Sequence, residues 1–114
     1  MNIDKFSVNN QLVEIKLNTE EILDRYGEEI IFYTHSHPKL TTYFKFFQSR
    51  LDGDYESLEA LMRDMILNSE GKPAIKSDQT LPTDIFTAAI LAVGDILGKS
   101  VSKTSKSEVG TLTE

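Results

Sequence analysis

The chain contains no cysteine and no tryptophan among its 114 residues. The absence of cysteine excludes a disulfide framework, a thiolate metal site and a cysteine nucleophile, and it suits a reducing compartment. No segment approaches the roughly 18 consecutive apolar residues of a membrane helix, and no apolar run follows a basic start. We therefore expect a protein of the cytoplasm, with neither a signal peptide nor a membrane span.

Sequence motifs for catalysis or nucleotide binding are also missing. The chain has no G-x-S-x-G, no G-x-x-x-x-G-K-[ST] and no G-x-G-x-x-G. Gly98-Lys99-Ser100 copies the end of a phosphate loop, but it follows an apolar segment and lacks the upstream glycine. Asp52-Gly53-Asp54 begins like a calcium loop, but the later positions of such a loop do not match. We therefore expect no enzymatic activity, no cofactor and no metal site.

Positive charge is scarce in most of the chain. Residues 1–98 carry nine Lys or Arg against sixteen Asp or Glu, whereas residues 99–114 carry three against two. Such an acidic body repels a phosphate backbone. Residues 99–114 contain neither arginine nor aromatic residues, so they make a poor RNA-binding arm. We expect no nucleic-acid partner.

Length and composition predict one folded domain. Hydrophobic residues make up 39% and charged residues 26% of the chain, which is typical of globular proteins. Residues 99–114 hold only three sizeable apolar residues, Val101, Val109 and Leu112, whose burial cannot offset the entropy lost on ordering the segment. We therefore expect a single helical domain with an N-terminal hairpin over residues 1–98 and a disordered, flexible tail over residues 99–114.

Alternating apolar residues at the N-terminus predict a β-hairpin. Phe6 and Val8 alternate on one side of Asn9-Asn10, and Val13, Ile15 and Leu17 alternate on the other. Asparagine tolerates the left-handed conformation of a tight hairpin turn. We expect strands near residues 3–8 and 12–17, which must pack on the helices because an isolated hairpin is marginal in water.

The pattern then becomes helical. A first helix is predicted over residues 19–35, capped by Asn18 or Thr19. Its apolar stripe is formed by Ile22, Tyr26, Ile30 and Tyr33. Because proline is preorganised for the first helical turn, a second helix should begin at Pro38, with Ser36 or His37 as its cap.

Three further helices are predicted behind Pro38. The second carries a stripe of Leu40, Tyr43, Phe44, Phe47 and Leu51. Phe46 lies off that stripe, so it either widens the buried face or is exposed. The third is capped by Asp54, buries Leu58, Leu61, Met62, Met65 and Ile66, and ends at Gly71 and Pro73. The fourth starts near Leu81-Pro82 or Thr83 and ends at Gly98. Its two adjacent apolar stripes are Phe86, Ile90, Val93 and Leu97, and Ile85, Ala89, Ala92 and Ile96. The expected fold class is mainly α: an N-terminal β-hairpin, then about four packed helices, then the disordered tail.

Two polar clusters were weighed as chemical sites. His35-Ser36-His37 could offer two imidazoles to a metal, but nothing fixes a third ligand, so a role at a helix junction is favoured. The carboxylates of the first helix, Glu20, Glu21, Asp24, Glu28 and Glu29, are favoured as a solvated face, because acid–base catalysis needs a carboxylate perturbed by burial.

The wide apolar faces predict a surface for a protein partner. The aromatic row of the second helix could stack on nucleic-acid bases, but core filling is favoured. An exposed Phe46 should bind the partner, whereas Phe86 should lie in the core. The residues expected at the partner surface are Tyr43, Phe46, Phe47, Ile90 and Leu97.

One stretch also resembles a known family. "GKPAIKSDQTLPTDIFTAAILAVGDILGKS" combines a Gly-Lys-Pro turn, a helix launched by Leu-Pro-x-Asp, and a Leu-Gly-Lys-Ser end before a low-complexity tail. Over residues 70–100 it resembles the tail assembly chaperones of long-tailed bacteriophages, and "FSVNNQLVEIKL" is similar to how several of them begin. The resemblance implies a small, mostly helical, non-enzymatic protein of the host cytoplasm. It would bind the tape-measure protein and the tail-tube protein during assembly. It also implies a longer form made by a programmed frameshift near the end of the gene.

Two other functional classes remain open beside a chaperone. One is a small structural component of a phage tail or baseplate, which would remain in the finished particle. The other is a regulatory protein-binding module, whose gene would not lie among tail genes. The sequence leaves the oligomeric state open and is compatible with a homo-oligomer.

Overall fold

The computed structural model describes residues 2–109, including the side chains of residues 2–98. Within this range a short 3-10 helix, η1 (Ile3–Phe6), precedes strand β1 (Leu12–Leu17), helix α1 (Glu20–Tyr26) and strand β2 (Ile30–His35). Helices α2 (Leu40–Asp52), α3 (Tyr55–Met65) and α4 (Thr83–Val109) follow. The predicted fold class is confirmed: the chain is mainly helical, with a two-stranded antiparallel hairpin in its N-terminal part and four α-helices.

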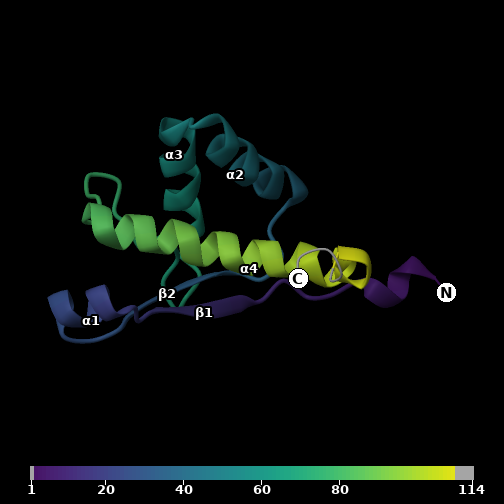
Figure 1. Cartoon of the computed structure of the whole chain (residues 1–114), viewed down its shortest axis with the longest axis horizontal. Helices are drawn as coiled ribbons and strands as arrows, with labels where there is room; N and C mark the ends of the chain where they lie inside the picture. Colours follow the sequence, from purple (N-terminus) through teal and green to yellow (C-terminus); the bar gives the residue numbers. More distant parts are fainter. Residues whose placement is uncertain (1, 110–114) are drawn as a thin grey trace.

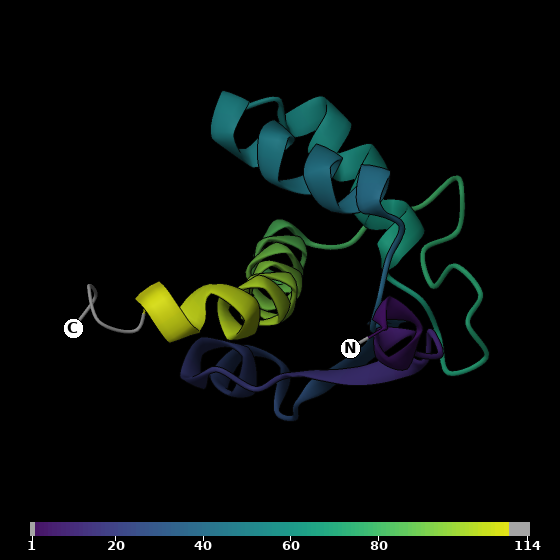
Figure 2. The same ribbon diagram turned by 90° about the vertical axis from the view of Figure 1, so that its right-hand side faces the viewer.

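The elements form three levels around α4. Figure 1 shows the two strands and α1 below α4, and α2 and α3 above it. The same order is seen in Figure 2 after a quarter turn. The core fills the space between the levels, and its fully buried side chains are Phe46 of α2, Met62 of α3 and Val93 of α4. None of the helices in the described part of the chain is long and apolar enough to cross a membrane.

The two strands pair in antiparallel register, with Ile15 opposite Phe32 and Leu17 opposite Ile30. Because successive side chains of a strand point to opposite faces, Ile15, Leu17 and Phe32 lie on one face and are buried. The other face carries charged or exposed residues such as Lys16 opposite Ile31. One face of the hairpin therefore belongs to the core.

The predicted positions of the first strand and the first helix are wrong. Residues 3–6 form η1, all of whose residues are exposed, and the partner of β1 is β2. The segment 30–35, predicted to continue the first helix, is a strand because Gly27 ends α1. Gly27 has φ 80°, and its N–H donates to the carbonyl of Leu23 at 2.9 Å. A helix cannot continue through a residue in this left-handed conformation. Thr19 caps α1 as predicted, accepting from the N–H of Ile22 at 3.3 Å.

Helices α2 and α3 lie in contact and are joined by a short turn at Gly53 and Asp54. Pro38 does not begin α2, whose N-cap is Lys39 without a side-chain hydrogen bond. At its other end Gly53, with φ 71°, stops the helix. Asp54 caps α3 as predicted: its carboxylate accepts from the N–H of Ser57 at 3.2 Å and from the Ser57 hydroxyl at 2.7 Å.

Helix α3 ends earlier than predicted because the chain behind it becomes extended. Leu67 exchanges backbone hydrogen bonds of 2.8 and 2.9 Å with Tyr33, so it adds to the free edge of β2. Ile66 then accepts from the N–H of Ala74 at 3.0 Å. These contacts tie the end of α3 to the hairpin. Gly71 lies in the following bend, and Pro73 pairs with Leu67 in an isolated antiparallel bridge.

Helix α4 continues past its predicted end. Its backbone is helical as far as Val109, and Gly98 has no positive φ, so the predicted stop at Gly98 is wrong. The flexibility of residues 99–114 stays a prediction. The side chains of residues 99–109 and the whole of residues 110–114 lie outside the described residues.

Candidate partner-binding surface

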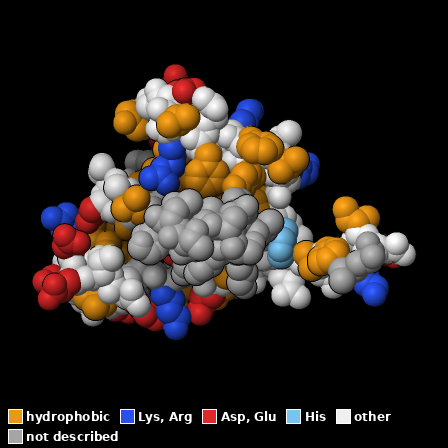
Figure 3. Space-filling model, turned by 45° about the vertical axis from the view of Figure 1, so that its right-hand side comes forward, with side chains coloured by type: hydrophobic (Ala, Val, Ile, Leu, Met, Phe, Trp, Pro, Cys, Tyr) orange, Lys and Arg blue, Asp and Glu red, His pale blue; other side chains and the backbone are white. Residues whose placement is uncertain are grey.

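One exposed apolar surface of the described chain lies on α2. Leu40, Phe44 and Leu51 expose 68%, 60% and 82% of their surface. They follow one another at i, i+4 and i+11, which places them on one side of a helix. Half-buried Phe47 lies between them at i+7. These four residues are called the α2 face below. Figure 3 shows hydrophobic side chains on the upper part of the molecule, where α2 and α3 lie.

The opposite side of α2 packs on the core. Phe46 is fully buried, and its ring meets that of Phe47 edge-on at 5.1 Å between centroids. The guanidinium of Arg50 lies 5.8 Å from the centre of the Phe46 ring. Gly94 of α4 allows this close approach, since a Cβ there would lie 3.4 Å from Phe46 Cε2. The helix is therefore held to α4 by Phe46.

The expectation that Phe46 is exposed is consequently wrong. Phe46 exposes 0% and Leu97 exposes 3%, so neither offers surface to a partner in this conformation. Tyr43, Phe47 and Ile90 are partly buried and pack against the core. A partner role for this set stays a prediction. Phe86 lies in the core, as expected.

Charged residues of both signs lie near the α2 face. No Asp or Glu occurs between residues 30 and 51, whereas Lys39, Lys45 and Arg50 fall in this range. Lys45 follows Phe44 and Arg50 precedes Leu51, so at 100° per residue they flank the face on its two sides. Lys45 also lines a hollow with Asp52, Asp54 and Asp64, so the charge beside the stripe is not of one sign.

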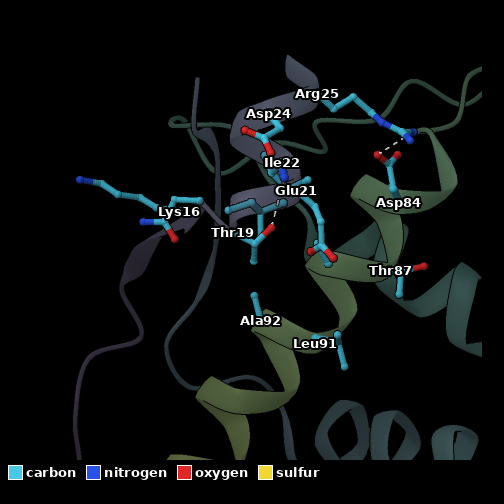
Figure 4. Close-up of a pocket in the computed structure, with 13 residues that line it drawn as sticks. Lys16, Thr19, Glu21, Ile22, Asp24, Arg25, Asp84, Thr87, Leu91 and Ala92 are labelled. Carbon is cyan, nitrogen blue, oxygen red and sulfur yellow. Dashed lines mark hydrogen bonds and ion pairs between the residues drawn. The ribbon is translucent and has the colours of Figure 1, made fainter. Parts of the chain in front are cut away.

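A groove of about 950 Å³ lies between α1 and α4, with the end of β1 at its side. It is called the α1–α4 groove below and is lined by Lys16, Leu17, Asn18, Thr19, Glu21, Ile22, Asp24, Arg25, Asp84, Thr87, Ala88, Leu91 and Ala92. Figure 4 shows Ala92 of α4 pointing across the space toward Thr19. Leu17 and Ile22 are buried at this place, whereas Leu91 exposes 56% of its surface.

Polar contacts close one end of the groove. Arg25 Nη1 lies 3.3 Å from Asp84 Oδ2, as the dashed line in Figure 4 marks. The Tyr26 hydroxyl lies 3.0 Å from both carboxylate oxygens of Asp84. Desolvation, together with the hydrogen bond to Asp84, raises the pKa of Tyr26. These contacts join α1 to the first turn of α4.

The charged residues that line the groove have both signs: Glu21, Asp24 and Asp84 lie beside Lys16 and Arg25. Residues 18–29 contain five Asp or Glu and only one cation, Arg25. Of the five carboxylates, only Glu29 is half-buried, and it lies 3.9 Å from Lys16 Nζ. The other four are exposed, as expected for a solvated face.

His35 is the last residue of β2 and His37 lies between β2 and α2, where a junction between two helices was predicted. The His37 N–H donates to Asn10 Oδ1 at 2.8 Å, and the Ser36 N–H donates to the carbonyl of Gln11 at 2.7 Å. The segment therefore holds the start of β1 beside the end of β2. Among the described residues no group of three or more His, Asp or Glu side chains could hold a metal ion.

Sequence reasoning missed the orientation of α2 and the groove. The exposed Leu91 lies outside both stripes expected for the fourth helix, and this displacement from the stripes was the available signal. Compared with family models, with curated proteins and with solved structures, the chain matches none.

Proposed function

We propose that the chain is a non-enzymatic binding protein that covers apolar helices of another protein. Following its resemblance to tail assembly chaperones, we take these clients to be the tape-measure protein and the tail-tube protein during phage tail assembly in the host cytoplasm. The observation that carries the proposal is the α2 face, where Leu40, Phe44 and Leu51 are exposed along one side of a helix.

The α2 face is suited to a helical client. Burying one large apolar side chain contributes about 1.5–3 kcal/mol, so three such residues supply a useful share of binding energy. Anchors spaced at i, i+4 and i+11 are the pattern with which helices pack against one another. A tape-measure protein with long amphipathic helices would present complementary stripes.

A test uses the long helical protein expected to be encoded downstream. Coexpression of the chain with a fragment of that protein should keep the fragment in the soluble fraction, and the pair should copurify. Phe44→Asp combined with Leu51→Asp should abolish copurification, because both side chains are exposed and their replacement leaves the core intact. Ile31→Asp is the matched control, since Ile31 is also an exposed apolar residue but lies on the sheet.

Analysis of purified particles, together with the coexpression test, separates the alternatives. A chaperone should be absent from purified particles, whereas a structural tail or baseplate component should be found in them by mass spectrometry. A regulatory binding module should leave the tape-measure fragment insoluble. Capture that survives the double substitution on α2 would contradict the proposed surface.

The gene offers an independent check on the chaperone proposal. The resemblance implies a frameshifted longer form, so a slippery heptamer is expected near the codons of Lys99, Lys103 or Lys106, with an overlapping frame that runs past Glu114. Without these features the structural tail or baseplate role would be favoured.

A further inference from the structure

We infer that the outer edge of β1 pairs with the same edge of a second copy, so that the two hairpins join into one continuous antiparallel sheet. The outer edge is the side of β1 that faces away from β2. The sheet of the described chain consists of β1 and β2, and no described segment pairs with β1 on its outer side. An unpaired edge offers backbone donors and acceptors to another strand.

The hydrogen bonds of Tyr33 show which backbone groups lie on this edge. Its N–H donates to the Leu67 carbonyl at 2.9 Å and its carbonyl accepts from the Leu67 N–H at 2.8 Å, so both groups point away from β1. Glu14 stands opposite Tyr33 in the register. In an antiparallel ladder, the two residues of such a pair both turn their backbone groups away from each other. The backbone groups of Glu14 therefore point away from β2, and those of Lys16, two positions on, do the same.

The outer edge is open to a partner strand. Glu14 and Lys16 are exposed, whereas Ile15 and Leu17 are buried on the other face of the sheet. None of the backbone hydrogen bonds between described segments involves the N–H or the carbonyl of Glu14 or Lys16. β1 contains no proline, and it pairs with β2 in an unbroken register without a bulge. Two common ways of blocking an edge strand are therefore missing.

The charges on β1 select a second copy as the occupant. The side chains of Glu14 and Lys16 are two positions apart, so they lie on the same outer face of the sheet and have opposite sign. A two-fold axis beside Ile15 places Glu14 opposite Lys16 of the second copy, and Lys16 opposite Glu14 of that copy. Both pairs also bring outward-pointing backbone groups together, so they can exchange hydrogen bonds. Opposite charges in direct cross-strand pairs stabilise a sheet.

Neighbouring registers are less favourable. A shift by two residues keeps the backbone groups matched but sets Glu14 against Glu14 or Lys16 against Lys16, and like charges directly opposite each other are destabilising. A shift by one residue brings an outward-pointing backbone group against one that points to β2, so the hydrogen bonds are lost. The edge is therefore complementary to itself in one register.

Contacts within the chain leave both charges available. Lys16 Nζ lies 4.0 Å from Glu14 Oε1 and 3.9 Å from Glu29 Oε2, and the Tyr33 hydroxyl donates to Glu14 Oε2 at 3.3 Å. Exposed ion pairs at such distances contribute little to stability. Glu29 directly precedes β2, so it lies on the inner side of Lys16, whereas Glu14 of the second copy would lie on the outer side.

The inference does not depend on the proposed function. Figures 1 and 2 show β1 on one side of α4 and α2 on the other, so pairing through β1 leaves the α2 face of both copies open. If both proposals hold, a dimer presents two α2 faces to one long client. Linking two binding surfaces in this way raises the affinity for a client that has two sites.

Sedimentation equilibrium of the full chain over a wide range of concentration tests the inference. The wild-type chain should show a monomer–dimer equilibrium, because a two-fold interface closes on itself. Glu14→Lys should raise the Kd of association by roughly tenfold or more, since it sets a lysine against Lys16 in both cross-strand pairs. Lys16→Glu should do the same. Glu59→Lys, at an exposed position of α3, makes the same change in net charge as Glu14→Lys and should leave the Kd unchanged.

Mixing the two charge variants gives the decisive measurement. In a mixed pair, the two lysines of the Glu14→Lys copy face the two glutamates of the Lys16→Glu copy, so the mixture should dimerise at least as tightly as the wild type. The chain with both substitutions should also recover, because it restores opposite charges in both pairs. Both residues are exposed, and circular dichroism would verify that the fold is retained. A wild-type chain that stays monomeric, or a mixture that stays monomeric, would overturn the inference.

Cysteine crosslinking tests the register. The chain has no cysteine of its own. A mixture of Glu14→Cys and Lys16→Cys copies should form a disulfide-linked dimer under mild oxidation, because directly opposite residues lie within the range of a disulfide. Glu14→Cys copies alone should crosslink much less, since their two thiols are diagonal neighbours. Equal crosslinking of both samples would contradict the register.

Amide hydrogen exchange tests the contact itself. The amides of Glu14 and Lys16 should exchange rapidly in the monomer and become protected as the concentration rises, whereas the amide of Ile15 faces β2 and should be protected throughout. Rapid exchange at Glu14 and Lys16 in a dimeric sample would refute the inference. The chain with Phe44→Asp and Leu51→Asp should still dimerise, so a failure of client capture and a failure of edge pairing are distinguishable.

Discussion

At the scale of single residues, two glycines act in different ways. Gly27 has φ 80° with no other group near its missing Cβ, so its role is conformational: it ends α1. Gly94 lies within α4, and a Cβ there would meet Arg50 Nη1 at 2.6 Å and Phe46 Cε2 at 3.4 Å. The absence of a side chain at Gly94 lets α2 pack closely against α4. The Arg50 guanidinium is the end of a flexible side chain and can move, whereas Phe46 is fixed in the core.

Substitutions at these glycines should therefore differ in cost. Gly27→Ala should lower the free energy of unfolding by about 1–2 kcal/mol, because a Cβ is strained in the left-handed region. Gly94→Ala should be close to neutral, since the gain in helix propensity of about 1 kcal/mol offsets the tighter contact with Phe46. Gly94→Leu should cost about 1–3 kcal/mol by overpacking. Urea denaturation measures all three, and a Gly94→Leu chain as stable as the wild type would show that α2 does not pack against α4.

Asp54 should make the stability of the chain depend on acid pH. Hydrogen bonds from the Ser57 hydroxyl and N–H lower the pKa of Asp54 below its ordinary value of 3.8. A group whose pKa is lowered by folding contributes stability that is fully present above its unfolded pKa and is lost as the pH falls through its folded pKa. The melting temperature of Asp54→Ala should therefore lie below that of the wild type at neutral pH. The difference should shrink as the pH falls below about 3.8.

Asp54→Ser is the control for this prediction. Serine can cap the helix but does not titrate, so its melting temperature relative to Asp54→Ala should not vary with pH. A wild-type advantage over Asp54→Ala that is constant across the acid range would show that the Asp54 carboxylate is not the titrating cap.

At the scale of elements, α2 reverses the usual relation between hydrophobic pattern and burial. Its most regular apolar stripe contains Leu40, Phe44, Phe47 and Leu51, yet three of these are exposed. The fully buried residues of α2 are Phe46 and a serine, Ser49, and Tyr43 and Phe47 are partly buried against the core. A helix normally turns its apolar stripe to its own core. This reversal is the physical basis for assigning a binding surface to α2.

Alanine substitutions should reveal the reversal directly. Phe46→Ala should lower the free energy of unfolding by about 3–5 kcal/mol, because it leaves a cavity in a packed site. Phe44→Ala should change it by less than about 0.5 kcal/mol, because Phe44 is already exposed to water. Both substitutions replace a phenylalanine of α2 by alanine and so remove the same atoms. The difference between their free energies of unfolding, measured by urea denaturation, therefore reports the difference in burial. Equal losses would refute the orientation of α2.

At the scale of the whole molecule, the core is shared by distant segments. Phe32 comes from the hairpin, Met62 from α3 and Val93 from α4, and all three belong to one cluster. The edge contact between Leu67 and Tyr33 also ties α3 to β2. Both strands and helices α2, α3 and α4 contribute to this cluster, whereas the buried residue of α1, Ile22, does not belong to it.

Residues 2–98 should therefore unfold in one cooperative step. Thermal melts followed by circular dichroism at the helix band and by tyrosine fluorescence should coincide, as expected for a small two-state domain. Ile15→Ala, in the hairpin, should lower both midpoints equally, since the hairpin shares the core with the helices. Separate midpoints would indicate that α2 and α3 form an independent unit.

The sequence by itself determined where several helices of this protein begin and end. The caps at Thr19 and Asp54, the break at Gly53 and the start of α4 near Thr83 depend on neighbouring residues, so they could be read along the chain. The mainly helical class followed from the same signals. Gly27 was visible too, but its left-handed conformation was not inferred, and the alternation of Ile30, Phe32 and Thr34 was read as helical.

Only the tertiary structure decided the pairing of β1 and the orientation of α2. A strand forms where a partner offers hydrogen bonds, and the partner of β1 lies beyond α1 in the chain. The buried side of α2 depends on α4, where Gly94 makes room for Phe46. Periodicity shows that a helix has an apolar side, but burial requires a surface to cover it, and that surface comes from residues far away in the sequence.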